Sequence, residues 1–442
     1  MHDHHIFAAA GAVAGVSIVV KGGTALRELV VAWLFGTSDP LDAYLVGYAV
    51  PYFVVTLLAG SLPHVLVPVY VRVHRREGAA AANDLASAVV SVCALALIAL
   101  ALVMGAAAAW YVPLVGYGFP RDKLPNSVHV ALILAPTVVT GVLISVLAAL
   151  LNAHRRFLPP AVSPLISSGV VVGCLLLFGA SAGVDALAYG LLAGSALELV
   201  GLYVLSRRHL ALRFAQPFSN PLVREVARSF VPTLIGSALM ATTLLVDQAM
   251  STGLPAGSVA ALSYATRLVT LPLGLTAAAL GTVVLPHYSE LAARADWRAL
   301  QASTRAYLRV IGAVTVPLAV LIGLLARPAT DLLLNHGAFT GADVSLVAAC
   351  IAALAAQVPF YTGVILLMRL ALSLRLNTSL AIISGVNLAL NVGLNAWLAP
   401  IIGVAGIALS TSLVYVVSFV LLLTRTEGAL RRAMSRQQVT AA

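Results

Sequence analysis

Long apolar stretches recur from one end of the sequence to the other, and they constrain its fold more than any other feature. A helix needs about 20 predominantly apolar residues to cross the hydrocarbon core of a bilayer. The stretches here are too long for the strands of a membrane barrel. Helices are the other structure in which the backbone N–H and C=O groups are all hydrogen-bonded inside lipid. We therefore predict an all-α polytopic membrane protein with about twelve transmembrane helices. The predicted spans are residues 6–35, 41–71, 84–113, 127–152, 159–179, 185–206, 229–251, 257–290, 304–326, 343–368, 376–398 and 402–424.

Composition and charge agree with this class. Of the residues, 61% are hydrophobic and 10% are charged, whereas soluble domains have about 25% charged residues. The formal net charge of +10 could suggest a nucleic-acid partner, but the distribution of the charge argues against one. With both termini on one side of the membrane, most of the 26 Lys and Arg residues fall in loops on that side. This asymmetry follows the positive-inside rule and predicts cytoplasmic termini.

Internal similarity divides the chain into two halves. LVPVYVRV (66–73) ends the second span and VVLPHYSEL (283–291) ends the eighth, while ISSGVVVG (166–173) in the fifth span is echoed by IISGVNLA (382–389) in the eleventh. Repeats that are an even number of spans apart have the same orientation in the membrane. We predict two six-helix lobes around a central cavity. The predicted parts are an N-terminal lobe (1–206), a cytoplasmic linker with amphipathic character (207–228), a C-terminal lobe (229–424) and a basic tail (425–442).

The sequence has no signature of an enzyme. Walker loops, HExxH motifs and CxxC motifs are all missing from it. We therefore expect a transporter without a cofactor, driven by a Na⁺ or H⁺ gradient or by the membrane potential. Prolines within the spans, such as Pro51, Pro136, Pro317 and Pro359, predict bends in the helices.

Ionisable residues inside the spans are few, and each is a candidate for function because a charge at the bilayer centre costs about 2.5–3.5 kcal/mol on insertion scales. Arg27 and Arg267 lie at similar depths in opposite lobes when counted from the outer ends of their helices. Two guanidinium groups there would form a bidentate clamp for pyrophosphate or carboxylates, with Lys21 assisting. The alternative is that each arginine pairs with a helix carbonyl or a nearby acid.

Two further polar groups lie within spans. Glu198 is solitary in its span, and it suits a hydrogen-bonded core acid as well as a proton carrier. Asp247 lies in the seventh span, and Asn387, Asn391 and Asn395 repeat at i, i+4 and i+8 on one face of the eleventh. Oxygen ligands with one carboxylate suit a hard monovalent cation. Hydrogen bonding between packed helices is the alternative.

The sequence resembles the MviN/MurJ lipid II flippases of the multidrug/oligosaccharidyl-lipid/polysaccharide (MOP) superfamily along essentially all of its spans. The resemblance rests on RELVVAWLFGTSDPLDAYLVGYAVP (27–51), LVPVY (66–70), LLNAHRRFLPPAVSP (150–164), SYATRLVTLPLGLTAAALGTVVLPHYSEL (263–291) and HGAFTGAD (336–343). It implies the MOP fold, worked by alternating access. It also implies that an undecaprenyl-pyrophosphate-linked glycan crosses the bacterial cytoplasmic membrane, with cell-wall or glycan-synthesis proteins as candidate partners.

The resemblance also implies roles for single residues. Arg27 and Arg267 match cavity arginines implicated in pyrophosphate binding, and Lys21 stands where the family commonly has arginine. Glu28 stands in place of an aspartate, and Asp42 matches an aspartate at the start of the second helix. With Glu198, these two acids would support the cavity.

Asp247, Asn387 and Asn391 fall near a sodium site of some members. The sequence departs from the family at Val55, where the second helix usually carries an arginine, and in lacking the usual two further helices. The resemblance implies that, in the family, those two helices form a groove for the polyprenyl tail. The departures keep open a different cargo, such as an O-antigen or exopolysaccharide lipid intermediate. A cation-coupled drug exporter and a non-transporting scaffold are more distant alternatives.

Overall fold

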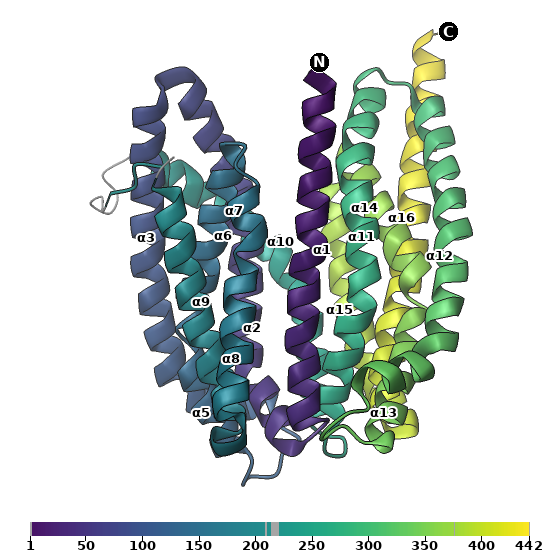
Figure 1. Ribbon diagram of the computed structural model, residues 1–442. Coiled ribbons are helices and arrows are strands. Elements are labelled where there is room, and N and C mark those ends of the chain that lie inside the picture. Colours follow the sequence, from purple (N-terminus) through teal and green to yellow (C-terminus); the bar gives the residue numbers. More distant parts are fainter. Residues whose placement is uncertain (1, 208–209, 214–220, 375, 442) are drawn as a thin grey trace. The chain divides into compact units, whose positions relative to one another are not determined.

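The computed structural model describes residues 2–207, 210–213, 221–374 and 376–441, and these parts of the chain are almost entirely helical (Figure 1). Sixteen helices, and no β-strand, occur within those ranges. Helices dominate because a backbone in lipid must satisfy its polar groups within one segment. The predicted all-α class is confirmed.

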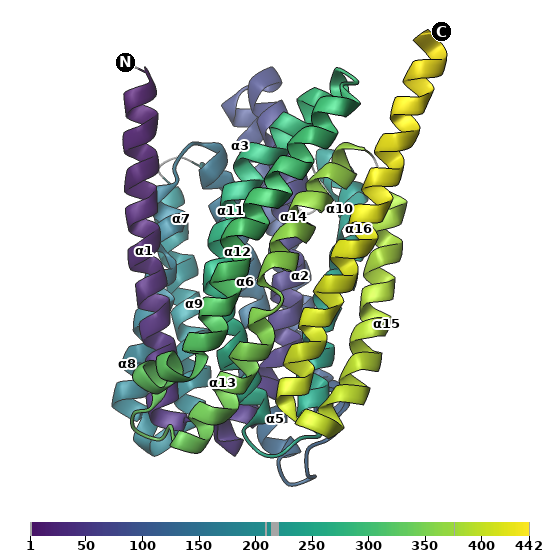
Figure 2. The same cartoon turned by 90° about the vertical axis from the view of Figure 1, so that its right-hand side faces the viewer.

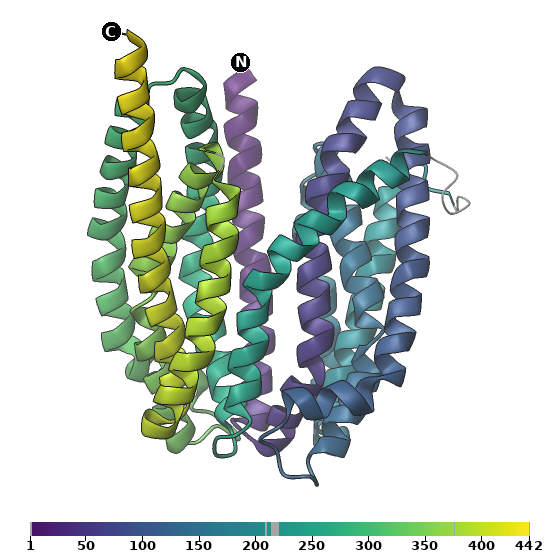
Figure 3. The same ribbon diagram turned by 180° about the vertical axis from the view of Figure 1, so that it is seen from behind.

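The first of two compact units consists of Met1–Leu245 together with His336–Phe339. Its helices are α1 (His2–Phe35), α2 (Asp39–Glu77), α3 (Ala79–Ala106), α4 (Ala108–Val115), α5 (Leu124–Leu134), α6 (Thr137–Ala153), α7 (Leu158–Val162), α8 (Pro164–Ala182), α9 (Val184–Ser206) and most of α10 (Pro221–Ser251). Helix α8 packs along α9, and α2 packs against α5 and α6 (Figures 1 and 3). Fully buried leucines, among them Leu66, Leu85 and Leu150, fill the core between α2, α3 and α6.

The second unit consists of Val246–Asn335 and Thr340–Ala442. Its helices are α11 (Ser258–Ala293), α12 (Trp297–Leu334), α13 (Gly341–Ala355), α14 (Val358–Ser373), α15 (Asn377–Ile402) and α16 (Val404–Ala441). Helix α16 runs beside α15 and also packs against α13 and α14 (Figure 2). Tyr288, Leu300 and Leu366 are fully buried at its core.

Several predicted spans are interrupted. The span predicted at 127–152 consists of α5 and α6, which are bent by 40°, and the span predicted at 343–368 consists of α13 and α14, which are bent by 42°. Pro136 and Pro359 lie at these two breaks, where the missing proline N–H favours the start of a new helix. Pro51 and Pro317, in contrast, lie inside the continuous helices α2 and α12.

The chain is a multi-pass membrane protein. Within the described residues, seven helices are long and apolar enough to cross a membrane, and nine are if each bent pair counts as one span. Each of the twelve predicted spans coincides with a helix or with consecutive helices. The number of twelve crossings itself stays a prediction.

The predicted linker at 207–228 lies partly outside the described residues. Its last part, from Pro221, forms the first turns of α10. Glu225 in these turns forms an ion pair with Arg72 of α2, with 2.6 Å between Oε1 of Glu225 and Nη2 of Arg72. Along the chain, the first unit passes into the second within α10, between Leu245 and Val246. The predicted lobe boundaries stay a prediction.

A turn from the α12–α13 connection is part of the first unit. The N–H of Ala338 donates to the carbonyl oxygen of Trp33, near the end of α1, at 2.8 Å. Gly337 has a φ of +66°, and a Cβ there would overlap Trp33. Gly36 has a φ of +54°, and a Cβ there would lie 2.6 Å from the carbonyl oxygen of Ala338. Both glycines are needed because the two turns approach each other so closely.

Candidate substrate and cation sites

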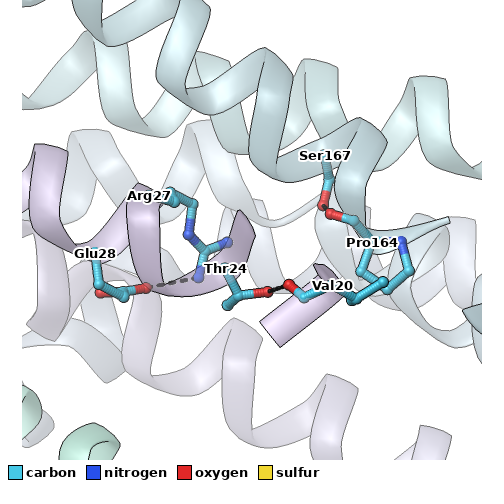
Figure 4. A network of polar contacts seen from close by, with 6 residues as sticks. All are labelled: Val20, Thr24, Arg27, Glu28, Pro164 and Ser167. Carbon is cyan, nitrogen blue, oxygen red and sulfur yellow. Dashed lines mark hydrogen bonds and ion pairs between the residues drawn. The ribbon is translucent and has the colours of Figure 1, made fainter. Parts of the chain in front are cut away.

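Arg27 forms an ion pair with the neighbouring residue on α1. Its Nη2 atom lies 2.7 Å from Oε1 of Glu28, and the side chains are 23% and 17% exposed (Figure 4). A guanidinium has five N–H donors in a fixed fork. The contact with Glu28 therefore positions the group and leaves donors that an anion could use.

The start of α8 lies beside the face of α1 that carries Arg27. Gly23 precedes Arg27 by four residues, so the two residues share a helix face. A Cβ at Gly23 would lie 2.5 Å from Cδ2 of Leu165, at the start of α8. Figure 4 shows Ser167 of α8 on the helix next to Arg27. Arg27 therefore faces the break between α7 and α8.

Glu198 of α9 is buried at the same break, with a side chain only 6% exposed. Ser163 precedes α8, and its hydroxyl donates to Oε1 of Glu198 at 2.9 Å. The hydroxyl of Ser167, in the first turn of α8, donates to the carbonyl oxygen of Pro164 at 3.4 Å. Arg27 and Glu198 thus lie on two helices, α1 and α9, that each pack against α8.

The other residues predicted for the head-group site differ in how exposed they are. Lys21 is exposed on α1 and forms no hydrogen bond or ion pair with any other described residue. Asp42 is buried in the first turn of α2, with 2% of its side chain exposed. Arg267 is exposed on α11. Arg27 and Arg267 belong to different units, and their clamp stays a prediction.

A buried polar cluster in the second unit surrounds Asp247, which lies on α10 and is 8% exposed. Oδ1 of Asp247 accepts hydrogen bonds from Nδ2 of Asn391 at 2.9 Å and Nδ2 of Asn395 at 2.7 Å. Oδ2 accepts a hydrogen bond from the hydroxyl of Thr411 at 3.0 Å. Three helices, α10, α15 and α16, therefore contribute to one site.

The membership of this cluster differs from the prediction at two positions. Asn387 is not among the hydrogen-bond donors to Asp247 within the described residues, and its Oδ1 accepts a hydrogen bond from Ser418 of α16 at 2.8 Å. Asn395 takes the place expected for Asn387, and its position in the i, i+4, i+8 row was the signal for it. Thr411 was missed, because nothing in the sequence distinguishes it from the other hydroxyl residues of its helix.

The donor set fits a hard cation. The side-chain oxygens of Asn391 and Asn395 are buried and have no hydrogen-bond partner within the described part of the chain. Two amide oxygens, one carboxylate and one hydroxyl are the ligand types that hard cations prefer, and a single negative charge suits a monovalent ion. No cluster of three or more His, Cys, Asp or Glu residues that could hold a metal ion was found among the described residues.

Comparison with solved structures identifies the fold. A structure described as "Lipid II flippase MurJ, inward closed conformation" superimposes with a TM-score of 0.81 and 21% identity, covering 97% of this chain and 91% of that chain. An inward-facing multidrug resistance MATE family transporter of the MOP superfamily superimposes with a TM-score of 0.77 and 13% identity, covering 92% of this chain and 95% of that chain. The predicted MOP fold is confirmed.

Sequence comparisons identify the family. The lipid II flippase MurJ of Burkholderia cenocepacia is 28% identical over 420 residues, which are 92% of this chain and 81% of that protein. A probable lipid II flippase MurJ of Thermotoga maritima is 28% identical over 408 residues, covering 90% of this chain and 81% of that protein. The model of the family described as "Lipid II flippase MurJ" matches residues 31–440. The predicted resemblance is confirmed, and this chain belongs to the MurJ family of lipid II flippases.

Proposed function

We propose that this chain moves lipid II, an undecaprenyl-pyrophosphate-linked peptidoglycan precursor, from the inner to the outer leaflet of the bacterial cytoplasmic membrane. The observation that carries the proposal is the family match, which extends over residues 31–440. The activity is transport and not an enzymatic reaction. A flippase changes the location of its substrate and neither makes nor breaks a covalent bond. The substrate is a lipid-linked glycan that is itself embedded in the membrane.

In this proposal, Arg27 and Arg267 bind the pyrophosphate, and Lys21 assists them. The exposure of the two arginines supports this role. Arg27 is partly exposed and Arg267 is exposed, although both lie on membrane helices. Each charge-assisted contact to the head group would contribute about 1.5–3 kcal/mol. The lipid tail stays in the bilayer while the head group crosses by alternating access.

We further propose that Na⁺ binds at the cluster of Asp247, Asn391, Asn395 and Thr411, and that its gradient helps to drive transport. The two amide oxygens buried without a partner in the described residues support a cation, because buried acceptors are otherwise paired. The ion would offset the negative charge of Asp247 inside the membrane.

Both termini are proposed to lie in the cytoplasm. Within the first unit, α2 ends with His74, Arg75 and Arg76, and residues 154–156 that follow α6 read His-Arg-Arg. These basic ends lie together, since the hydroxyl of Tyr70 is 2.6 Å from Nε2 of His154. Basic residues of membrane proteins are concentrated on the cytoplasmic side. The shared position of these basic helix ends therefore supports a cytoplasmic location for that side.

Rescue of a bacterium depleted of its essential lipid II flippase tests the proposed function. Wild-type protein should restore growth, whereas Arg27→Ala and Arg267→Ala should not, at equal amounts in the membrane. Arg294→Ala is the matched control, because Arg294 is an exposed arginine paired with Glu290 on the same helix, and it should rescue fully. Failure of well-expressed wild-type protein to rescue would refute lipid II as the cargo and point to another polyprenyl-linked glycan.

A further inference from the structure

Arg155, which follows α6, has a backbone conformation that is unusual for arginine. Its φ is +58°, and Ala295 is the other non-glycine residue with a positive φ in the described ranges. The N–H of Arg155 donates to the carbonyl oxygen of Asn152 at 2.9 Å. The N–H of Arg156 donates to the carbonyl oxygen of Leu151, also at 2.9 Å. This pair of bonds is the Schellman motif, in which glycine is the usual residue at the position of Arg155.

The positive φ of Arg155 costs free energy, because a side chain crowds the following carbonyl group in left-handed backbone. Backbone strain of this kind is concentrated at functional sites. The side chain of Arg155 is therefore a candidate for a function that glycine could not provide.

An aromatic cluster holds this strained turn against the end of α2. The hydroxyl of Tyr70, whose residue is 2% exposed, lies 2.6 Å from Nε2 of His154. The ring of His74, one turn after Tyr70, has its centroid 5.6 Å from that of His154. Each of these two histidines is followed by two arginines, which are Arg75 and Arg76 on α2 and Arg155 and Arg156 after α6.

These four exposed arginines form what we call the arginine surface. None of the four has an ion pair with another described residue, whereas Arg72 at the same end of α2 pairs with Glu225. Glu77 is the one acid in the segments 74–77 and 154–156, so the surface keeps an excess of positive charge. The contact between the two histidines brings the two arginine pairs to neighbouring points of the backbone before any ligand binds.

Apolar side chains follow the arginine surface directly. Phe157 and Leu158 come after Arg156 and are 48% and 54% exposed. Arginines beside exposed aromatic and leucine side chains are typical of segments at the boundary between lipid head groups and acyl chains. The arrangement therefore fits a lipid whose phosphate contacts the arginines and whose chains lie beside Phe157 and Leu158.

The positive-inside rule explains why basic residues occur at this end of the helices, but it does not explain their arrangement. Any Lys or Arg in these loops would satisfy the rule, and an arginine in left-handed backbone is not needed for it. Guanidinium groups bind two phosphate oxygens at once, and basic pockets between membrane helices on the cytoplasmic side bind anionic head groups.

We propose that the arginine surface binds the phosphate group of an anionic phospholipid, phosphatidylglycerol, in the leaflet that faces the cytoplasm. The bound lipid anchors the ends of α2 and α6 at the membrane surface. This site is separate from the proposed head-group site at Arg27, and it does not depend on lipid II being the cargo.

Native mass spectrometry of the full chain, titrated with phosphatidylglycerol or with the neutral lipid phosphatidylcholine, tests the assignment. Wild-type protein should bind phosphatidylglycerol more tightly than phosphatidylcholine. Arg155→Gly should weaken the binding of phosphatidylglycerol about fivefold, which is the effect of one arginine at an anionic membrane surface. Adding Arg156→Gln should weaken it further, and neither change should alter the binding of phosphatidylcholine.

The choice of glycine separates binding from folding. Arg155→Gly relieves the left-handed strain, so the variant should unfold in neutral detergent at the same temperature as wild type or at a higher one. Ala295→Gly is the matched control, because Ala295 has the same backbone conformation in a turn of the same kind after α11 and carries no charge. This control should bind phosphatidylglycerol as wild type does.

Each outcome decides the proposal. Wild-type affinity for phosphatidylglycerol in the variant with both Arg155→Gly and Arg156→Gln would overturn it, and so would equal affinity of the wild type for the two phospholipids. If that variant instead loses affinity only for undecaprenyl pyrophosphate, the arginines serve the substrate and the phospholipid assignment is wrong. Failure of the rescue assay with phosphatidylglycerol binding intact would refute lipid II as the cargo and leave this inference standing.

Discussion

Asn395 donates a hydrogen bond of 2.7 Å from its side-chain nitrogen to Oδ1 of Asp247, while its own side-chain oxygen is buried without a hydrogen-bond partner in the described residues. The same is true of Asn391, one turn earlier on α15. The carboxylate of Asp247 thus has hydrogen-bond donors, whereas the two asparagine oxygens have none in the described residues. Such a cluster is incomplete as a hydrogen-bond network, and a bound cation would complete it.

Replacing Asp247 by asparagine should abolish stabilisation by sodium. Wild-type protein in detergent should unfold at a higher temperature in NaCl than in KCl, because an ion that binds only the folded state stabilises it by about 2.7 kcal/mol at 100 times its Kd. Asp247→Asn should unfold at the same temperature in both salts. Asn387→Ala is the control, since Asn387 contacts Ser418, and it should keep the difference. Equal unfolding temperatures of the wild type in the two salts would argue against the site.

The contact between α8 and α9 predicts a large effect from a small substitution. Gly194→Ala would place a methyl group against the backbone of Ser167, and backbone cannot move aside as a flexible side chain can. We expect a loss of about 1–3 kcal/mol in the free energy of unfolding. Gly169→Ala on α8 should be harmless, because no atom lies within 4 Å of the added carbon. Thermal unfolding of the two variants side by side checks this, and equal stabilities would contradict the packing.

The turn that meets the end of α1 is also sensitive. Gly337→Ala should lower stability by about 1–3 kcal/mol, because alanine tolerates a positive φ poorly and its Cβ would overlap Trp33. Gly341→Ala, four residues later, meets no atom within 4 Å and serves as the control. Thermal unfolding should separate the two variants. A Gly337→Ala protein as stable as Gly341→Ala would show that this turn does not pack against Trp33.

Lys21 should act through its charge alone. It is exposed and forms no hydrogen bond or ion pair within the described ranges, so Lys21→Arg should support growth in the depletion assay. Lys21→Glu should reduce growth, because it adds a negative charge where an anionic head group would bind. Growth is best compared at graded expression. Full activity of Lys21→Glu at low expression would exclude Lys21 from the head-group site.

Prolines illustrate where sequence reasoning reaches its limit. All four of the prolines considered predicted bends, yet Pro136 and Pro359 lie at breaks between helices while Pro51 and Pro317 lie inside unbroken ones. A proline always removes one backbone hydrogen bond. Whether the helix then breaks depends on what packs around the freed carbonyl, and the local sequence does not contain that information.

The sequence by itself determined the helical membrane class, the family and the identity of the few charged residues inside the spans. It could do so because hydropathy and backbone hydrogen bonding in lipid are local properties of a segment. Family motifs such as 27–51 and 263–291 are local in the same sense.

Only the tertiary structure decided which of these residues meet. Asn387, Asn391 and Asn395 are equivalent on the face of α15, and the positions of α10 and α16 direct the last two to Asp247 and the first to Ser418. Likewise, the packing of α8 against α9 brings the hydroxyl of Ser163 to the carboxyl group of Glu198, although the two residues belong to different predicted spans. Contacts between helices depend on how side chains of several helices fit together, and no single segment encodes that fit.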